Sequence, residues 1–305
     1  MDEGGRFKDE TLKQRVLGSL FAGAVADAFG NLYEGKPNGL KCNLVADSYS
    51  ITSDDTQLTL ATCESIVRSG GVAPEKVAEA FLEIHTSDGI RGVGSSTLKA
   101  MRDLEVGAHW YLAGARGERA AGNGAAMRIA PLGFLLNLDL DELPTIVRDV
   151  SSITHHNDEA YAGALAVVLC IRMIVEGRDR LTIIWQLIDL LPDTQVRDCL
   201  KKLQEDSEIS IGQASEISGT SGFVAESVPL AIFAGLKGFD CGLSEIIETV
   251  VGCGGDTDTI GSMAGQIAGA ILGVNSDLLG LLEKLDDRDA IRRNVEAFAK
   301  FVAVL

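Results

Sequence analysis

A chain of 305 residues is long enough for one large domain or two small ones, and hydrophobic residues make up 46% of it, which is ample for a buried core. The 27 basic and 44 acidic residues give a formal net charge of −17. This charge would repel a phosphate backbone, so it excludes nucleic-acid binding as a main role.

Apolar side chains at helical spacing predict a first helix over residues 12–30, with Gly30 as its C-terminal cap. Residues 31–52 lack periodicity and carry Gly, Pro and Asn, so they are predicted to form a long loop of a kind that is often functional. Helical spacing then recurs in residues 56–68, 74–85, 94–104, 129–136, 140–152, 158–176, 181–191, 194–204, 223–235, 243–251, 256–273 and 287–302.

Strand periodicity is nearly absent from the sequence. The two short candidates, near residues 50 and 183, are ambiguous, so we predict an all-α fold. No linker rich in Pro, Ser or like charges divides the chain, and no repeat of fixed period is visible, which predicts a single domain over residues 1–305.

The cysteines and the first residues of the chain indicate its compartment. The six cysteines include no C-x-x-C pair, which favours reduced, buried thiols. The charged start and the lack of an apolar stretch of about 20 residues predict a cytoplasmic protein that makes no contact with a membrane. The acidic surface favours a monomer.

Two acidic segments stand out, each at the predicted start of a helix. One is Ser53-Asp54-Asp55-Thr56, and the other is the stretch from Gly254 to Thr259, which contains Asp256 and Asp258. Helix capping is the alternative role for either segment alone, because Ser, Thr and Asp accept hydrogen bonds from free N–H groups. Capping needs only one side-chain oxygen, however, and adjacent carboxylates repel each other unless a cation lies between them.

The residue types in these segments favour a hard cation. Carboxylate, hydroxyl and carbonyl oxygens without Cys or paired His suit magnesium, manganese or calcium and disfavour zinc. Asp256 and Asp258 would diverge by about 200° on a continuous helix. We therefore expect both carboxylates to converge in the turn before the helix, where Gly254 and Gly255 supply flexibility.

Five motifs in order resemble those of the ADP-ribosylglycohydrolase family and span most of the chain. They are the early helix with the pattern G-S-L-x-x-G-A-x-x-D-A-x-G (residues 18–30), S-D-D-T-Q (53–57), G-N-G-A-A-M-R (122–128), T-H-H (154–156) and G-G-D-T-D-T-I (254–260). The resemblance implies an orthogonal bundle of many helices with two Mg²⁺ or Mn²⁺ ions at the base of a cleft. The metal ligands that it implies are Ser53, Asp54, Asp55, Asp256, Asp258 and Thr259.

The resemblance also implies the substrate, which is ADP-ribose attached through the anomeric carbon of its distal ribose to an acceptor. Glu34, seven residues after Asp27, is the first candidate for the catalytic carboxylate, and a solvated loop glutamate is its alternative role. Asp55 is the second candidate, because a carboxylate held at the metals can activate water. Asp27 is predicted to support the structure, because a buried carboxylate needs partners.

Three further segments are candidates for substrate binding. Backbone N–H groups of Gly122, Asn123 and Gly124 precede an apolar segment and suit a phosphate, although an ordinary helix turn is the alternative. His155 is assigned to the cleft by the resemblance. The small, flexible loop with Gly219, Ser221 and Gly222 is expected to contact the nucleotide.

The resulting hypothesis is a metal-dependent hydrolase that removes ADP-ribose from ADP-ribosylated protein, with arginine as the acceptor because the T-H-H stretch resembles that of the arginine-specific branch of the family. Two alternatives stay open at this point. One is a hydrolase of a free ADP-ribose derivative, and the other is a catalytically silent protein that binds ADP-ribose.

Overall fold

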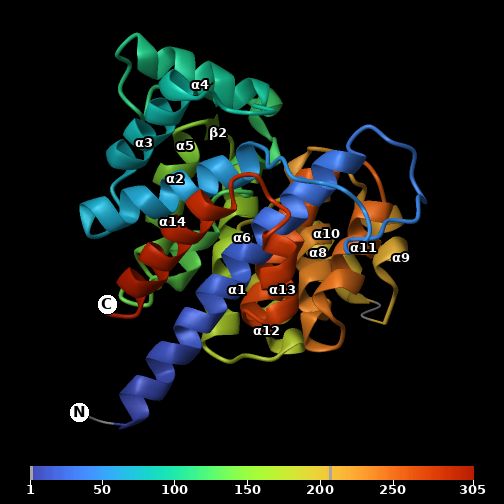
Figure 1. Ribbon diagram of the computed structural model, residues 1–305. Coiled ribbons are helices and arrows are strands. Elements are labelled where there is room, and N and C mark those ends of the chain that lie inside the picture. Colours follow the sequence, from blue (N-terminus) through green and yellow to red (C-terminus); the bar gives the residue numbers. More distant parts are fainter. Residues whose placement is uncertain (1–2, 206–207) are drawn as a thin grey trace.

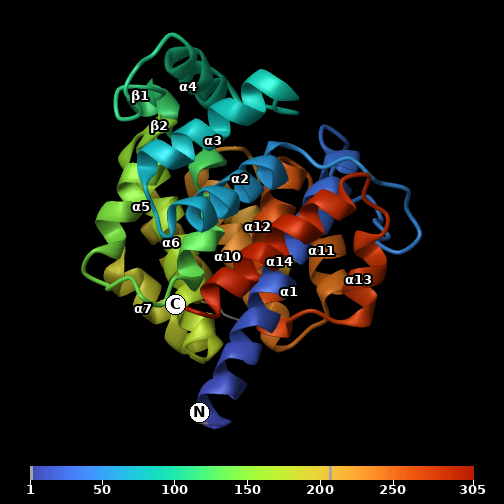
Figure 2. The same ribbon diagram turned by 60° about the vertical axis from the view of Figure 1, so that its left-hand side comes forward.

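The computed structural model describes residues 3–205 and 208–305, and these residues form a helical fold. Figures 1 and 2 show the helices packed around one another in many directions. The described residues contain the α-helices α1 (Glu3–Tyr33), α2 (Asp54–Ser69), α3 (Pro74–Ser87), α4 (Ser95–Glu105), α5 (Leu143–Ser152), α6 (Asp158–Val175), α7 (Arg180–Leu190), α8 (Gln195–Glu205), α9 (Ile211–Ser218), α10 (Val224–Leu236), α11 (Leu243–Gly252), α12 (Thr257–Leu272), α13 (Ser276–Leu282) and α14 (Arg288–Val302).

The remaining regular elements are short. Four 3₁₀ turns, η1 (Glu118–Ala120), η2 (Asn123–Ala125), η3 (Ala130–Phe134) and η4 (Lys237–Phe239), join the helices. Strands β1 (Ala115–Arg116) and β2 (His155–His156) pair in parallel, and they are the only strands among residues 3–205 and 208–305. The prediction of an all-α fold is therefore confirmed.

The centre of the fold is the antiparallel pair of helices α1 and α12. Small residues face each other along its length: Gly18 lies against Gly269, and Gly30 lies against Asp258 at the other end. A Cβ atom on Gly265 would stand only 2.7 Å from the carbonyl oxygen of Ala22, so the two backbones are in direct contact. This close approach brings the end of α1 to the beginning of α12.

Gly30 differs from its predicted role as a cap. The first helix continues through it to Tyr33, so the irregular loop begins at Glu34 and not at residue 31. Gly30 is needed at this position because a Cβ atom there would lie 2.5 Å from Cα of Asp258 and would overlap the carbonyl oxygen of Thr257. A tertiary contact, and not the end of a helix, explains this glycine.

Other boundaries also differ from the prediction. The helix predicted over residues 129–136 is the 3₁₀ turn η3, in which Pro131 has no N–H group to donate. The short helices α9 and α13, of 8 and 7 residues, were not predicted. Both lack the length over which helical periodicity becomes visible, although a capping box of Ser210 and Gln213 marks the start of α9.

Within α1, the stretch Glu10–Tyr33 is long and apolar enough by length and composition to cross a membrane. The prediction that the chain lacks an apolar stretch of this length is therefore wrong. In the structure, 83% of the most apolar 18 residues of this stretch is buried inside the protein, as in a helix of a protein core.

Candidate metal and substrate site

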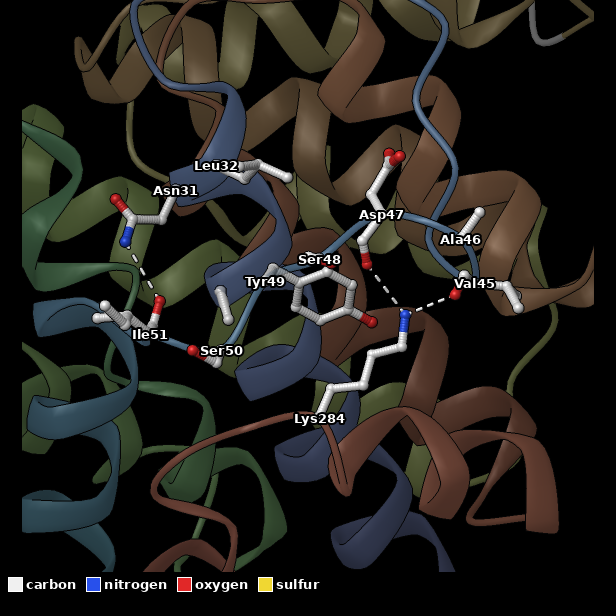
Figure 3. A pocket seen from close by; sticks show the side chains of 11 residues that line it. Asn31, Leu32, Val45, Ala46, Asp47, Ser48, Tyr49, Ser50, Ile51 and Lys284 are labelled. Atoms are coloured by element: carbon white, nitrogen blue, oxygen red, sulfur yellow. Dashed lines mark hydrogen bonds between the residues drawn. The ribbon is translucent and has the colours of Figure 1, made fainter.

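Two hollows lie near the end of α1, and only one of them is acidic. The larger, of about 670 Å³, is formed by α1, residues 45–51 and Lys284 (Figure 3). The ammonium group of Lys284 donates to the carbonyl oxygens of Leu44, Val45 and Asp47 at 2.6–3.1 Å, so all three of its protons are used within the protein. This hollow contains none of the predicted site residues.

The second hollow, of about 300 Å³, contains most of the predicted site, and we call it the acidic cleft. It is lined by Glu34, Asp54, Gly92, Gly94, Ser95, Ser96, Thr97, Arg119, Gly122, Asn123, Gly124, Met127, His155, Gly222, Asp256, Asp258 and Thr259. The first turns of α2 and α12 form its base, because both acidic segments begin helices there.

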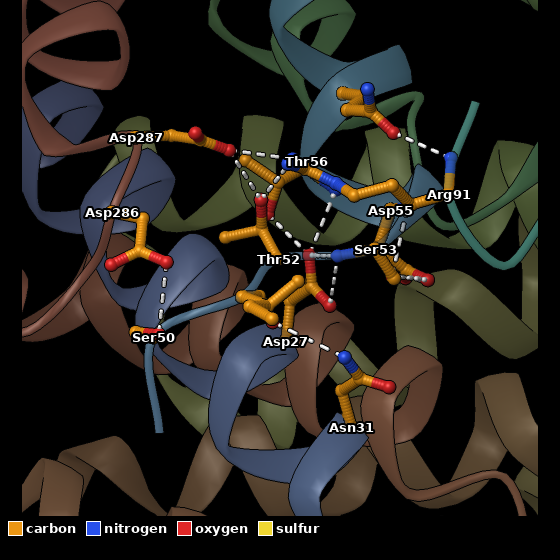
Figure 4. Close-up of polar contacts among 12 residues, drawn as sticks. Asp27, Asn31, Ser50, Thr52, Ser53, Asp55, Thr56, Arg91, Asp286 and Asp287 are labelled. Carbon is orange, nitrogen blue, oxygen red and sulfur yellow. Dashed lines mark hydrogen bonds and ion pairs between the residues drawn. The ribbon is translucent and has the colours of Figure 1, made fainter. Parts of the chain in front are cut away.

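Asp27 of α1 connects this helix to the start of α2. Its carboxylate is fully buried and accepts hydrogen bonds from the backbone N–H groups of Ser53 at 3.0 Å and Thr56 at 3.1 Å, and from the hydroxyl of Thr56 at 2.5 Å (Figure 4). These N–H groups would otherwise be free at the beginning of α2. Asp27 therefore holds in place the helix end that carries Asp54 and Asp55.

Asp55 is the most deeply buried of the predicted metal ligands. Its Oδ2 accepts hydrogen bonds from the hydroxyls of Ser53 at 3.2 Å and Thr259 at 3.0 Å. Its Oδ1 is buried and has no hydrogen-bond partner among the described residues. A buried carboxylate oxygen without a partner is costly, and a bound cation would satisfy it.

Carboxylate oxygens converge in two groups that share Asp258. Oxygens of Asp27, Asp55 and Asp258 lie within 4.8 Å of one another, and so do oxygens of Glu34, Asp256 and Asp258. Together with the unpartnered oxygen of Asp55, this arrangement of hard oxygen donors fits divalent cations such as Mg²⁺ or Mn²⁺.

The electrostatics of the cluster lead to the same conclusion. Burial, followed by the charge of Asp27, raises the pKa of Asp54 to about 7. Burial, followed by the neighbouring Asp256, raises the pKa of Asp258 to about 9, and burial also raises the pKa of Asp55 well above its usual range. Carboxylates in such a place stay ionised at neutral pH only when positive charge compensates them.

The Gly254-Gly255 pair supplies the turn that the sequence analysis predicted. Both glycines have positive φ angles, 76° and 81°. Asp256 occupies the N-cap position of α12, whereas Asp258 lies inside its first turn, so only one of the two carboxylates precedes the helix as expected. The two carboxylates converge because Asp256, the N-cap residue, has a non-helical ψ angle of 70°.

The segment 122–124 forms a wall of the acidic cleft. The side-chain amide of Asn123 donates a 2.6 Å hydrogen bond to Oδ2 of Asp256, and its backbone N–H donates to the carbonyl oxygen of Gly222. Asn123 thus orients a predicted metal ligand in addition to lining the cleft. Gly222 lies beside the same carboxylate, since a Cβ atom on it would stand 3.2 Å from Oδ2 of Asp256.

Gly219 and Ser221 are not among the residues that line the acidic cleft. The side chain of Glu226 accepts a 3.0 Å hydrogen bond from the backbone N–H of Ser221 and also lies against Gly219. The carbonyl oxygen of Thr220, between them, accepts a 2.8 Å bond from the N–H of Asp256. In the structure this loop supports Asp256.

Glu34 and His155 both lie at the cleft, although in different surroundings. Glu34 is exposed just after α1, with its carboxylate near Asp256 and Asp258. His155 is buried in strand β2, where its Nδ1 lies 2.7 Å from the hydroxyl of Thr154. Burial, followed by the charge of Arg128, lowers the pKa of His155 to about 3, so the ring is neutral.

The sequence analysis missed one wall of the cleft. Gly92, Gly94, Ser95 and Ser96 lead into the first turn of α4, and Arg119 is the one basic residue among those that line the cleft. The pattern G-V-G-S-S before a helix was the available signal, since glycines followed by hydroxyl side chains at a helix start favour an anion.

An ion pair fixes this wall to the metal-ligand segment. The guanidinium group of Arg91 donates to the hydroxyl of Thr52 at 2.8 Å and to Asp287 at 2.5 Å, and its backbone N–H donates to the side chain of Gln57 (Figure 4). Thr52 directly precedes Ser53. The wall, the start of α2 and the start of α14 are thereby held together.

Comparison with known proteins identifies the family. The family model for ADP-ribosylglycohydrolases matches residues 8–304. The uncharacterized protein YegU of Escherichia coli K12 is 28% identical over 94% of this chain and 97% of YegU. An uncharacterized protein of Archaeoglobus fulgidus is 28% identical, over 72% of this chain and 70% of that protein.

Two further similarities agree with this match. The ADP-ribosylhydrolase ARH3 of Gallus gallus is 26% identical over 79% of this chain and 74% of its own length. A solved structure described as an ADP-ribosylglycohydrolase-related protein complex has a TM-score of 0.69 at 22% identity, over 96% of this chain and 99% of that chain, and so shares the fold. The chain therefore belongs to the ADP-ribosylglycohydrolase family and is a glycosyl hydrolase of that family.

Proposed function

We propose that this protein hydrolyses the bond between the anomeric carbon of the distal ribose of ADP-ribose and an arginine side chain of a modified protein, with two Mg²⁺ or Mn²⁺ ions as cofactors. The observation that carries the proposal is the convergence of buried carboxylates from three helices at the base of the cleft, with Oδ1 of Asp55 unpartnered. When bound, such ions supply Lewis acidity and lower the pKa of a coordinated water.

The residues proposed to hold the ions all offer hard oxygen donors, and they lie at the starts of helices α2 and α12. The helix dipoles favour carboxylates at these ends. Asp27 and Asn123 position the ligands through their hydrogen bonds to the start of α2 and to Asp256. The proposed ligands are Ser53, Asp54, Asp55, Asp256, Asp258 and Thr259.

Two carboxylates are proposed for proton transfer and charge stabilisation. Cleavage at an anomeric carbon passes through an oxocarbenium-like state; water adds to the carbon, and the departing nitrogen gains a proton. Glu34 is exposed beside Asp256 and Asp258, where it can exchange protons with solvent and serve as the acid or base. Asp55, whose buried carboxylate would be ionised beside the cations, is the second candidate and would activate a coordinated water.

The walls of the cleft are proposed to bind the rest of ADP-ribose. Backbone N–H groups at the start of α4, with Ser95, Ser96 and Arg119, suit the diphosphate. The adjoining wall, with Asn123 and His155, would take the nucleoside part. The start of α4 adjoins Asp54, since a Cβ atom on Gly92 would lie 3.8 Å from its Oδ1, so the proposed cations would compensate the charge of the diphosphate as well as that of the carboxylates.

Arginine is proposed as the acceptor because of the charge at the cleft. Glu34 and Asp256 are at least partly accessible to solvent, and their carboxylates would attract a guanidinium group on the modified protein. A neutral acceptor such as a hydroxyl would gain nothing from this charge. The resemblance of the T-H-H stretch at residues 154–156 to the arginine-specific branch of the family is a further reason to propose this acceptor.

The test measures the release of free ADP-ribose from a protein carrying ADP-ribosylarginine and from one carrying ADP-ribosylserine. Each substrate is tried with Mg²⁺, with Mn²⁺ and with a chelator. We expect metal-dependent release, faster from arginine. Release from serine alone would refute the arginine acceptor, and turnover of only free ADP-ribose derivatives would support the first alternative. Tight ADP-ribose binding without any release would support a silent binding protein.

A further inference from the structure

Arg128 is a fully buried arginine behind the wall of the cleft. Its guanidinium group donates to the carbonyl oxygens of Gly124 at 2.5 Å and Val150 at 3.3 Å, and to the hydroxyl oxygen of Thr154 at 2.9 Å. It lies over the ring of Phe81 and forms no ion pair with a described carboxylate. A guanidinium group has only donors, so the three oxygens must accept from it, while its Nε–H has no hydrogen-bond partner among the described residues.

The hydroxyl of Thr154 lies between Arg128 and His155. Its oxygen accepts a hydrogen bond from Arg128 and lies 2.7 Å from Nδ1 of His155. The hydroxyl proton can therefore be donated to an unprotonated Nδ1, and both the hydroxyl of Thr154 and Nδ1 of His155 then have a partner. Among the described residues this fully buried hydroxyl forms no hydrogen bond besides those with Arg128 and His155.

The opposite tautomer of His155 is less favourable. If Nδ1 carried the proton and donated it to Thr154, the hydroxyl proton would have no acceptor in a buried place. Leaving a buried donor unpaired costs about 1–3 kcal/mol. The doubly protonated ring is also disfavoured, because burial and the charge of Arg128 lower the pKa of His155 to about 3. The remaining form is the neutral ring with its proton on Nε2.

Nε2 faces the acidic cleft past two glycines. A Cβ atom on Gly122 would lie 3.4 Å from Nε2, and one on Gly124 would lie 3.3 Å from Nε2 and 2.9 Å from Cε1. None of the described residues hydrogen-bonds this nitrogen, while only 4% of His155 is exposed. The glycines leave this edge of the ring open to a ligand in the cleft.

We propose that Arg128, acting through the hydroxyl of Thr154, fixes His155 as a neutral Nε2–H donor that hydrogen-bonds an acceptor atom of the bound ADP-ribosyl group. The inference rests on the proposed function, because it takes an ADP-ribosyl group as the ligand of the cleft. Arg128 and Thr154 are positioning residues, and His155 binds substrate. The donor recognises an oxygen or a ring nitrogen, and it would reject a donor group at the same place.

The test compares Thr154→Val, which keeps the shape and removes the hydroxyl, with Thr154→Ser, which keeps the hydroxyl. Nitrogen-15 NMR of the four histidines reports the tautomer, and His155→Gln assigns the signals. We expect the Nε2–H form in the unchanged protein and in Thr154→Ser, and a mixture of tautomers in Thr154→Val. The Kd for free ADP-ribose and the KM should rise about 10-fold in Thr154→Val, the equivalent of one hydrogen bond, with kcat nearly unchanged.

The NMR measurement needs no turnover, so it separates this inference from the proposed function. A protein that binds ADP-ribose without hydrolysing it still supports the inference, provided that Thr154→Val weakens binding. A proton on Nδ1 in the unchanged protein would overturn it, and so would an unaltered Kd in a Thr154→Val protein with a changed tautomer. If Thr154→Val does not fold, the unchanged protein is titrated with ADP-ribose and followed by NMR. The inference then requires that the Nε2–H signal of His155 shifts when ADP-ribose binds.

Discussion

The hydroxyl of Thr259 donates a 3.0 Å hydrogen bond to Oδ2 of Asp55, although 204 residues separate the two in the sequence. The bond joins the first turn of α12 to the first turn of α2. Because both helices begin at the base of the cleft, their partial positive charges favour the carboxylates gathered there. The carboxylates exceed what two helix ends can compensate, which is the physical reason to expect cations.

Replacing Asp55 with asparagine keeps the side-chain shape and removes one charge from the cluster. We expect the affinity for Mn²⁺ to fall on the order of 100-fold, about 2.8 kcal/mol, with a parallel loss of kcat/KM. The metal-free variant should unfold at the same or a higher temperature, because repulsion between carboxylates is reduced. Metal titration and thermal unfolding in a chelator measure both effects. Asp141→Asn, at an exposed position, is the control; full activity in Asp55→Asn would exclude this residue as a ligand.

Asn123→Ala tests the support of Asp256 from outside the predicted ligand set. The lost 2.6 Å hydrogen bond leaves the carboxylate of Asp256 free to rotate. A loss of about 10–100-fold in metal affinity or activity is typical when a group that orients a ligand is removed. Activity as a function of Mn²⁺ concentration shows the effect, and Asn137→Ala at an exposed position controls for the substitution. Unchanged metal dependence would limit Asn123 to substrate contact.

Local sequence patterns predicted most helices and both acidic segments, because caps and apolar periodicity are properties of neighbouring residues. Gly30 shows where this reasoning fails. A glycine at the end of an apolar run resembles a cap, whereas its place in the structure is set by the backbone at Asp258, 228 residues later in the chain. No periodicity within α1 contains that information.

The site shows the same limit. The sequence named the carboxylates but did not reveal that Asp27 caps α2, because that role depends on hydrogen bonds between separate helices. The direction in which His155 presents its ring depends likewise on Arg128 and Thr154. Residue types could therefore be predicted, and their orientation could not.

The ion pair of Arg91 and Asp287 should matter more to catalysis than to stability. About 40% and 36% of their side chains are exposed, and pairs of this kind contribute about 0–1 kcal/mol to unfolding. Arg91→Met should therefore cost at most about 1 kcal/mol of stability. We expect KM to rise, because the wall with Gly92 and Gly94 loses its anchor at Thr52.

A double-mutant cycle with Asp287→Asn measures whether the two changes act through the same contact. The effects on KM should be less than additive. Lys76→Met, which removes the exposed ion pair to Glu79, is the control and should leave KM unchanged. Fully additive effects would show that Arg91 acts on the cleft without Asp287.

The stability of the metal-free protein should fall as the pH rises. The folded-state pKa values of Asp54 and Asp258, about 7 and about 9, lie above the ordinary value of 3.8. A carboxyl group with a raised pKa contributes stability that is complete below the ordinary value and is lost as the pH rises through the folded-state value. The unfolding temperature in a chelator should therefore decrease from pH 5 to pH 9.

Saturating Mg²⁺ should remove or reverse this decrease, because a cation favours the ionised carboxylates. The comparison of the two pH series is the measurement. Parallel series with and without Mg²⁺ would contradict binding of the cation at these residues.

Gly30→Ala tests the close contact of α1 with α12. The added Cβ atom would lie 2.5 Å from Cα of Asp258 and would overlap the carbonyl oxygen of Thr257, and backbone atoms cannot move aside as the end of a side chain can. Overpacking of this kind costs about 1–3 kcal/mol. The matched change Gly280→Ala lies in α13, where nothing stands within 4 Å of the new atom, and should stabilise the protein by up to about 1 kcal/mol.

Chemical denaturation gives the free energy of unfolding of both variants. Metal affinity measured in the same two variants shows whether the displaced backbone carries Asp258 with it. If Gly30→Ala unfolds more easily and yet binds Mn²⁺ as tightly as before, the contact serves only packing; if both fall together, the contact of α1 with α12 sets the distance between the carboxylates.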